Sequence, residues 1–365
     1  MFLTNLWKRG IVVTLVIALL ISVVGCTPKD STTVDVEDNQ EKENVVELAE
    51  ENVDEEPVEE IRIVDHLGRE IVLEKEAERL VSGYYITSSM LIALGLKDNV
   101  VGIEAKADTR PIYALTAPEL LDLPNVGTAK EFNLEGTIGL EPDLVILPIR
   151  LKEAVESLEK LGINVIAVNP EDMDLLKETL AMIGEATGTM ERAERLIAYY
   201  DGKTEEIEKL VADKERKRVY LGGNSDFLST ATSKMYQNYM IETAGGKNVA
   251  GDIDDTYWAN ISYEQLIAYN PDIIIIAPGA SYTKEDVLND SRLASINAIQ
   301  NNEVYVMPGD VESWDSPVPS SILGTMWLTS ILNGEDYPYD KFVDDAVSFY
   351  EDFYNITIDR EVFSR

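Results

Sequence analysis

Cysteine and histidine are almost absent from this sequence. Its 365 residues include one cysteine, Cys26, and one histidine, His66. A single cysteine can form no disulfide within the chain and no thiolate metal cluster. A zinc site of the usual His/Cys kind, an HExxH metalloprotease and a Ser-His-Asp triad built elsewhere in the chain all need further histidines. Most common enzyme chemistries therefore lack their residues here.

Positive charge is also scarce, with 31 Lys and Arg against 67 Asp and Glu and a formal net charge of −36. Nucleic-acid backbones require a basic surface, so nucleic-acid binding is excluded, as is polybasic attachment to anionic lipid. No GxxxxGK[ST] loop is present, because Gly245-Gly246-Lys247 lacks the upstream glycine. Basic protein partners remain compatible with this charge. Hydrolysis by a pair of carboxylates also stays open, because acidic residues abound.

The N-terminus has the features of a secretory leader. Two basic residues precede an apolar run over residues 11–24, which ends at Gly25-Cys26. This order is typical of a signal peptide, and Val-Val-Gly-Cys resembles a bacterial lipobox, in which the cysteine is lipidated. The run is shorter than the ~20 apolar residues of a spanning helix. We expect a signal peptide over residues 1–25 and a lipid anchor on Cys26; the alternative is an ordinary cysteine beside an uncleaved anchor.

Residues 26–60 follow as an acidic spacer. From residue 27 on they contain fourteen Asp and Glu, two Lys and no aromatic residue. Such a segment cannot bury enough apolar surface to offset its ordering entropy, so we expect a disordered tether. Anchor and tether together predict an extracytoplasmic protein attached to the outer face of the cytoplasmic membrane.

One pattern occurs twice, at residues 133–148 and 262–278. Each copy begins with a helix-capping residue, has a glutamate two places later (Glu135 and Glu264) and reaches Pro-Asp seven residues after that glutamate. Each then enters an unbroken apolar run that stops at a proline, which indicates a strand buried on both faces of a parallel sheet. A helix–strand unit repeated at long range predicts two similar α/β lobes in one chain.

The two copies resemble segments of the helical-backbone class (class III) of substrate-binding proteins of ABC importers, which serves ferric siderophores, haem and vitamin B12. The resemblance covers residues 61–355. It implies an α/β fold of two Rossmann-like lobes joined by a long helix, with the ligand cleft between them, and neither catalysis nor a resident cofactor. It also implies an ABC permease and its ATPase as partners of a monomer. In that class one carboxylate per lobe docks onto arginines of the permease, and the matching positions are Glu135 and Glu264.

The rest of the chain divides accordingly. Strand and helix signals alternate over residues 61–170 and again over 216–365, where two helices close the chain. Residues 171–215 between them have apolar residues at three- and four-residue spacing, which predicts helices. A rigid helix as the only link would permit a small rocking of the lobes. His66 falls in a hairpin turn, where we expect it to face solvent.

Ligands of open α/β sheets bind beyond the carboxyl ends of the strands. Basic side chains there would contact an anionic solute, and aromatic side chains would supply flat apolar walls. For each residue alone, a solvated surface charge or lobe packing is the alternative. The loops expected at these ends provide the candidate ligand-binding residues Tyr84, Tyr85, Lys106, Arg110, Lys130, Arg150, Asn224, Tyr257, Trp258 and Trp314.

These residues predict capture of a metal chelate, with a ferric siderophore as first expectation and a corrinoid, haem or a molybdate-type oxyanion as alternatives. Haem would need one tyrosinate, from Tyr84 or Tyr85, to ligate its iron. A free divalent metal is disfavoured by the single histidine. Outside this class, the alternatives are a surface hydrolase with two facing carboxylates and a sensor lobe coupled to a signalling partner.

Overall fold

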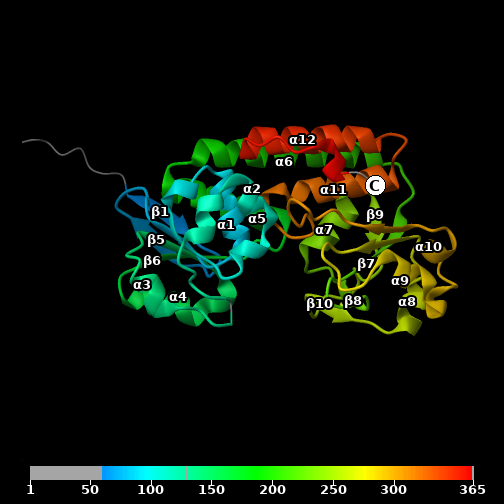
Figure 1. Ribbon diagram of the computed structural model, residues 1–365, viewed down its shortest axis with the longest axis horizontal. Coiled ribbons are helices and arrows are strands. Elements are labelled where there is room, and N and C mark those ends of the chain that lie inside the picture. The colour runs from blue at the N-terminus through cyan, green and yellow to red at the C-terminus, as the bar shows by residue number, and fades with distance from the viewer. Residues whose placement is uncertain (1–59, 129, 364–365) are drawn as a thin grey trace, which may run out of the picture. The chain divides into compact units, whose positions relative to one another are not determined.

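Two larger β-sheets with flanking helices, and a two-stranded hairpin, make up the part of the chain that the computed structural model describes, residues 60–128 and 130–363 (Figure 1). The expectations for the signal peptide, for Cys26 and for nearly all of the tether lie outside the described residues. The described residues belong to one compact unit, so the boundaries expected near residues 170 and 215 stay a prediction. No helix in the described part of the chain is long and apolar enough to cross a membrane.

The first sheet has four parallel strands in the order β4-β3-β5-β6. Every residue of β5 is buried, which explains why its sequence is an unbroken apolar run. An antiparallel hairpin precedes the sheet, and Gly68 takes the positive φ of 73° that its turn requires. The strands are β1 (Ile61–Val64), β2 (Glu70–Leu73), β3 (Leu80–Ser82), β4 (Val100–Ile103), β5 (Leu144–Pro148) and β6 (Asn164–Val168).

Short helices connect these strands. The strands and helices together form what we call the first lobe. The helix α1 follows β3 directly and is buried along nearly its whole length. The α-helices are α1 (Tyr85–Ala93), α2 (Pro111–Thr116), α3 (Leu134–Ile138) and α4 (Lys152–Lys160), with 3-10 turns at Lys97–Asn99, Ala107–Thr109, Pro118–Asp122 and Ile149–Leu151.

The second sheet has six strands, five of them in the order β10-β8-β7-β11-β12, while β9 pairs with β7. The strands β7, β9, β11 and β12 run parallel, whereas β8 and β10 are antiparallel to their neighbours. With its helices this sheet forms the second lobe. Its elements are β7 (Lys217–Gly222), β8 (Ser229–Ala231), α7 (Tyr236–Thr243), β9 (Gly246–Asn248), β10 (Trp258–Asn260), α8 (Tyr263–Tyr269), β11 (Ile273–Ile276), α9 (Lys284–Asn289), a 3-10 turn at Ser291–Leu293, α10 (Asn297–Gln300) and β12 (Val304–Val306).

The repeated sequence pattern is a repeated structure. The Asn133 side chain caps α3 by accepting from the Gly136 N–H at 2.9 Å, and Ser262 caps α8 in the same way through Gln265 at 3.2 Å. The aspartate of each Pro-Asp pair then fixes the start of a neighbouring strand. Its carboxylate accepts a hydrogen bond from the backbone N–H of an arginine, and the backbone carbonyl of the same arginine accepts one from the aspartate N–H. This arginine is Arg79 for Asp143 and Arg218 for Asp272. The α/β fold class predicted from the repeat is confirmed.

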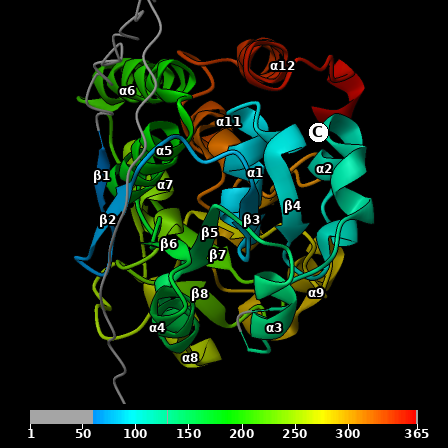
Figure 2. The ribbon, with the colours of Figure 1, turned by 90° about the vertical axis from the view of Figure 1, so that its left-hand side faces the viewer.

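Long helices connect the two lobes. The chain leaves β6 through α5 (Met173–Thr187), turns at Gly188 and continues as α6 (Met190–Val211), which packs on α5 at one end and on α7 and α11 of the second lobe further along (Figures 1 and 2). The chain closes with a 3-10 turn at Pro319–Ser321, α11 (Ile322–Leu332), α12 (Tyr339–Tyr354) and a 3-10 turn at Arg360–Phe363.

The sequence suggested that one helix is the only link between the lobes, but helix α12 connects them as well as α6. The Tyr199 ring of α6 lies 5.3 Å from Phe349 and 5.4 Å from Phe353 of α12, between ring centroids, and α12 also contacts α1 of the first lobe. This aromatic face holds the two long helices together. Both helices therefore resist relative motion of the lobes.

The expectation that His66 faces solvent is wrong. Its side chain is only 9% exposed, because the hairpin turn packs against the segment that joins β6 to α5. Its Nδ1 accepts a 2.7 Å hydrogen bond from the Asn169 N–H, and its Nε2 lies 3.3 Å from a Glu178 carboxylate oxygen. His66 thus has a structural role at the edge of the first sheet.

Candidate ligand site

The carboxyl ends of parallel strands from both lobes surround one cavity of about 350 Å³. Segments that follow β3, β5 and β6 line it from the first lobe, and the segment that follows β7 lines it from the second. We call it the Arg150 cavity. Its place is the one that the strand-end rule for α/β sheets predicts. Five of the candidate residues line it: Tyr84, Tyr85, Arg150, Asn224 and Trp258.

Two tyrosines and an arginine form the first-lobe wall of the Arg150 cavity. The rings of Tyr84 and Tyr85 meet edge to face, with centroids 5.3 Å apart. The guanidinium carbon of Arg150 lies 4.7 Å from the centre of the Tyr84 ring, within the range of a cation–π contact. Burial raises the pKa of both tyrosines, so both are neutral phenols at neutral pH and can donate hydrogen bonds.

Two carboxyl groups that the sequence analysis did not select also line this cavity. Burial raises the pKa of Asp315 to about 6, and it raises the pKa of Glu171 although nearby Arg150 opposes the shift. The cavity therefore combines one cationic side chain with two acids. Glu171 follows the end of β6, so the strand-end rule could have identified it. It was missed because its residue type carries little information in a chain with 67 acidic residues.

A buried amide adds a further acceptor. Gln237 is 4% exposed and lines the Arg150 cavity, and its Oε1 has no hydrogen-bond partner among the described residues. A buried acceptor without a partner costs free energy that a ligand donor would recover. Gln237 lies in α7 rather than in a strand-end loop, so no local sequence signal marks it as a site residue.

The remaining candidates lie elsewhere. Arg110 lines a second cavity beyond Tyr85, and its guanidinium carbon is 4.1 Å from the centre of the Tyr85 ring. Lys106, Lys130 and Tyr257 are exposed and line neither cavity.

The expectation for Trp314 requires correction. Its side chain is 1% exposed and packs between Phe342 and Phe363, and its Nε1 donates to the Tyr350 hydroxyl at 2.9 Å. Trp314 is thus a core residue, because the C-terminal helix and turn fold over its loop. The next residues of the loop, Asp315 and Ser316, face the cavity instead.

The two carboxylates expected to dock on a permease occupy equivalent places. Glu135 lies in the first turn of α3 and Glu264 in the first turn of α8, and both are exposed. Hydrogen bonds from its own backbone N–H and from Ser262 lower the pKa of Glu264, so this carboxylate is ionised at neutral pH. Within the described ranges, no group of three or more His, Cys, Asp or Glu side chains is placed to hold a metal ion.

Comparison with known proteins agrees with this architecture. The family model described as "Periplasmic binding protein" matches residues 80–311. The molybdate-binding protein MolA of Haemophilus influenzae is 27% identical over 323 residues, which is 80% of this chain and 90% of MolA. The structure of MolA bound to molybdate has a TM-score of 0.73 at 22% identity and covers 82% of this chain and 99% of that one.

Two further proteins extend the comparison. A cobalamin-binding protein of Halobacterium salinarum is 28% identical over 240 residues, which is 64% of this chain and 63% of that protein. A periplasmic solute-binding protein of Veillonella parvula has a TM-score of 0.73 at 23% identity, covering 82% of this chain and 94% of that one. Substrate-binding proteins of this kind work with an ABC permease and its ATPase. The chain therefore belongs to the periplasmic binding protein family, in the helical-backbone class of ABC-importer substrate-binding proteins.

Proposed function

We propose that this chain is the extracytoplasmic, lipid-anchored solute-binding protein of an ABC importer, and that its solute is a compact metal chelate, most simply a small ferric siderophore. The observation that carries the proposal is the Arg150 cavity, which both lobes line at the carboxyl ends of their strands. The protein captures the solute there and releases it to the permease without chemistry of its own.

The mixed polarity of the cavity supports a chelate rather than a bare ion. Arg150 and the phenol of Tyr84 offer donors, whereas Asp315, Glu171 and the Gln237 amide oxygen offer acceptors. A chelate presents both kinds of group, because its organic ligand has acidic oxygens and N–H or O–H donors. A bare dianion would bind beside two carboxyl groups that repel it unless they are protonated.

The volume of the cavity supports a compact solute. Ligand pockets typically have volumes of ~300–1,000 Å³, so a cavity of about 350 Å³ is near the lower limit. A corrinoid or haem would need the lobes to move apart, and two long helices that pack together oppose this movement. The similarity to MolA keeps a molybdate-type oxyanion as the second candidate.

Delivery requires contact with the permease. The exposed carboxylates Glu135 and Glu264 begin equivalent helices of the two lobes, and we propose that they dock onto basic side chains of the permease. The high negative charge of the chain suits such a partner and would speed their association. Lipidation of Cys26 would keep the protein at the membrane surface where the permease lies.

A titration of the purified protein tests the solute. Trp258 lines the Arg150 cavity, so its fluorescence should report binding there. Ferric siderophores, haem, cobalamin, cobinamide and molybdate would be added separately, with native mass spectrometry for stoichiometry. Saturable one-to-one binding of a ferric siderophore supports the proposal. In the Trp258→Phe variant the fluorescence change should disappear, whereas mass spectrometry should still detect the complex. Binding of molybdate alone would overturn the chelate assignment.

A further inference from the structure

The charged side chains that line the Arg150 cavity are few. Arg150 is the one lysine or arginine among the lining residues, and the two acids are Glu171 and Asp315. Arg150 and Glu171 follow β5 and β6 of the first lobe, whereas Asp315 lies in the segment that follows β12. A solute in this cavity would therefore lie between one cationic side chain and two acids.

The acids of the cavity offset the charge of Arg150 at neutral pH. Asp315 is 9% exposed, and burial raises its pKa to about 6, which still leaves the carboxylate ionised at pH 7. The Gln237 side chain donates a hydrogen bond to this carboxylate and so opposes the shift. Burial also raises the pKa of Glu171, and the nearby Arg150 guanidinium opposes that shift. Asp315 alone thus balances Arg150, and Glu171 adds negative charge wherever it is ionised.

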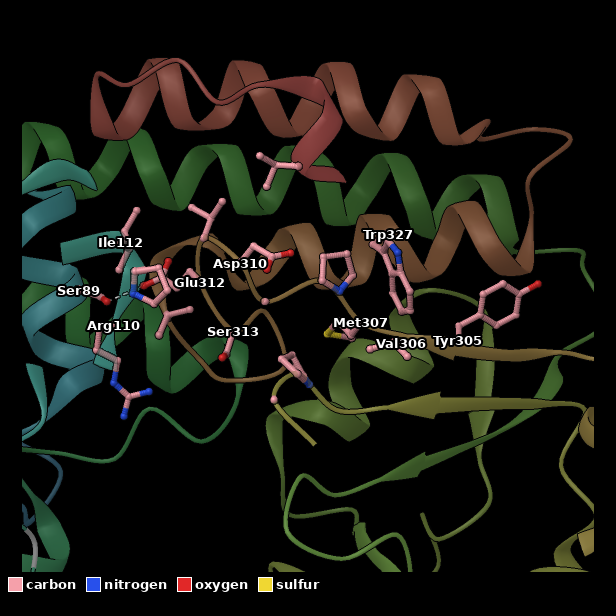
Figure 3. Close-up of a pocket in the computed structure, with 18 of the residues that line it drawn as sticks. Ser89, Arg110, Ile112, Tyr305, Val306, Met307, Asp310, Glu312, Ser313 and Trp327 are labelled. Carbon is pink, nitrogen blue, oxygen red and sulfur yellow. Dashed lines mark hydrogen bonds between the residues drawn. The ribbon is translucent and has the colours of Figure 1, made fainter. Parts of the chain in front are cut away.

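Two further sources of positive charge lie near the cavity. Arg110 stacks on the Tyr85 ring, but Figure 3 shows it at the wall of the second cavity. The buried acids Glu104 and Glu312 interact with its charge there. The first turns of α1 and α7 also line the Arg150 cavity, and a helix N-terminus contributes about half a unit of positive charge. With both acids ionised, the wall of the cavity is therefore close to electrically neutral.

Such a wall suits a solute without net charge. An anionic chelate would give up its hydration and would be repelled by ionised carboxylates on both sides of Arg150. A neutral chelate avoids this cost, because its metal-bound oxygens can accept from Arg150 while N–H groups of its organic ligand donate to the acids. Charges placed against the wrong solute are a common source of specificity.

We propose that Glu171 and Asp315 make the Arg150 cavity specific for electrically neutral metal chelates and exclude anionic ones. Tris-hydroxamates are one such class, since three singly charged ligands balance the charge of a trivalent metal. This inference rests on the proposed chelate-binding function and specifies the class of chelate. The two acids determine specificity because they cancel positive charge that would otherwise attract anions.

Two chromium(III) complexes test this proposal, because chromium(III) exchanges its ligands too slowly to change them during a titration. Tris(acetohydroxamato)chromium(III) is neutral and tris(oxalato)chromate(III) is a trianion, and in both complexes six oxygen atoms surround the metal. Calorimetric titration of the full protein at pH 7 should show one-to-one binding of the neutral complex. We expect the trianion to bind at least tenfold more weakly.

The variant that carries both Glu171→Gln and Asp315→Asn tests the acids themselves. It removes both charges and keeps the side-chain shape and a hydrogen-bond acceptor at each position. We expect it to bind the trianion at least tenfold more tightly than the parent protein does, which is a gain that a folding defect cannot produce. Glu153→Gln is the matched control, because Glu153 is an exposed acid of the first lobe that lines neither cavity. It should leave both affinities unchanged.

The pH dependence gives a second measurement, since protonation removes the same charges. The affinity for the trianion should rise as the pH falls from 8 through about 6, where Asp315 takes up a proton. This rise should disappear in the double variant. The other titratable groups of the wall keep one protonation state over this range, because burial raises the pKa of the phenols and a guanidinium stays protonated: Tyr84, Tyr85, Tyr236 and Arg150.

Three results would overturn the proposal. Equal or tighter binding of the trianion by the parent protein would show that the acids exclude nothing, while chelate binding itself would stand. A preference for the neutral complex that persists unchanged in the double variant would mean that shape rather than charge selects the solute. Absence of binding of both complexes at millimolar concentration would overturn this inference together with the chelate assignment, so the two failures are distinguishable.

Discussion

The Tyr85 hydroxyl donates a hydrogen bond across the cleft to Ser316 Oγ, and four residues further along the same helix Ser89 Oγ donates to Glu312 Oε1. Glu312 is buried and also accepts from Ser320 Oγ at 2.5 Å and from the Tyr354 hydroxyl at 3.3 Å. Three neutral donors from separate segments therefore stabilise one buried carboxyl group. Removal of one donor leaves that group under-satisfied in a low-dielectric environment.

We expect Ser89→Ala to lower the free energy of unfolding by ~1–3 kcal/mol, because it removes the first-lobe donor of Glu312 without creating a large cavity. Urea denaturation of both proteins would measure the difference. Ser295→Ala provides the control, since Ser295 is exposed and its loss should change stability by less than ~0.5 kcal/mol. Equal effects of the two substitutions would show that the contact between the lobes has no net stabilising value.

Because several acids are buried, we expect the free energy of unfolding to fall as pH rises. Burial raises the pKa of Glu104 to about 7 and that of Asp315 to about 6, above their ordinary values of 4.5 and 3.8. Between the ordinary and the raised values the folded state binds more protons than the unfolded state, so the stability from these groups is lost as pH increases. For Glu104 the shift corresponds to a loss on the order of 3 kcal/mol between pH 4.5 and pH 7.

Urea midpoints from pH 5 to pH 8 would measure this dependence. We expect the midpoint to decrease from pH 5 to about pH 7 and to level off above it, and we expect a smaller decrease in Glu104→Gln, which has no group to titrate there. The relevant observable is the slope, since the amide also changes the hydrogen bonds from Ser88 and Tyr113 and so shifts all midpoints. Asp272 does not interfere, because the Arg218 hydrogen bond lowers its pKa to about 2. A flat profile in the parent protein would contradict the prediction.

Trp314 supports the core rather than the ligand site, and its replacement should show this. We expect Trp314→Ala to cost ~3–5 kcal/mol in the free energy of unfolding, because it opens a large cavity beside Phe342 and Phe363. The comparison is Trp258→Ala, whose side chain is 38% exposed and whose loss should cost ~1 kcal/mol or less. A stable Trp314→Ala protein with altered solute binding would return Trp314 to the ligand site.

Local sequence signals predicted the parts of the fold that depend on neighbouring residues. The caps Asn133 and Ser262 and the buried runs of β5 and β11 each follow from a few consecutive side chains, so the repeated unit and the α/β class were accessible from the sequence. Tyr84 and Arg150 were found for the same reason, because a strand-end loop is a local feature.

Features that join distant segments were not predictable in this way. The hydrogen bond of Tyr85 joins it to Ser316, 231 residues further along the chain. The burial of Trp314 depends on the return of the chain to Phe363, and the role of Gln237 depends on the way α7 faces the cavity. No local pattern records such placements, since they follow from the packing of whole elements.

The Arg150 guanidinium should be required for solute binding through its shape as well as its charge. Its planar group stacks on Tyr84 and can offer two parallel donors, whereas a lysine ammonium can do neither. We expect both Arg150→Lys and Arg150→Gln to weaken the solute at least tenfold in the Trp258 fluorescence titration. Lys130→Gln should leave the affinity unchanged. An unchanged solute affinity of Arg150→Lys would mean that only the charge matters at this position.

The last prediction concerns delivery. Reversal of charge at Glu135 and Glu264 together should abolish uptake of the solute by cells and leave its affinity for the purified protein unchanged, because both carboxylates are exposed on α3 and α8 and line neither cavity. Each single reversal should give a partial loss, since one lobe keeps its contact with the permease. Glu153→Lys is the matched control, because Glu153 is also an exposed acid in the first turn of a helix, α4. Uptake at the normal rate in the double variant would remove both glutamates from the docking surface, whereas equal loss in the control would show that net charge alone governs the association.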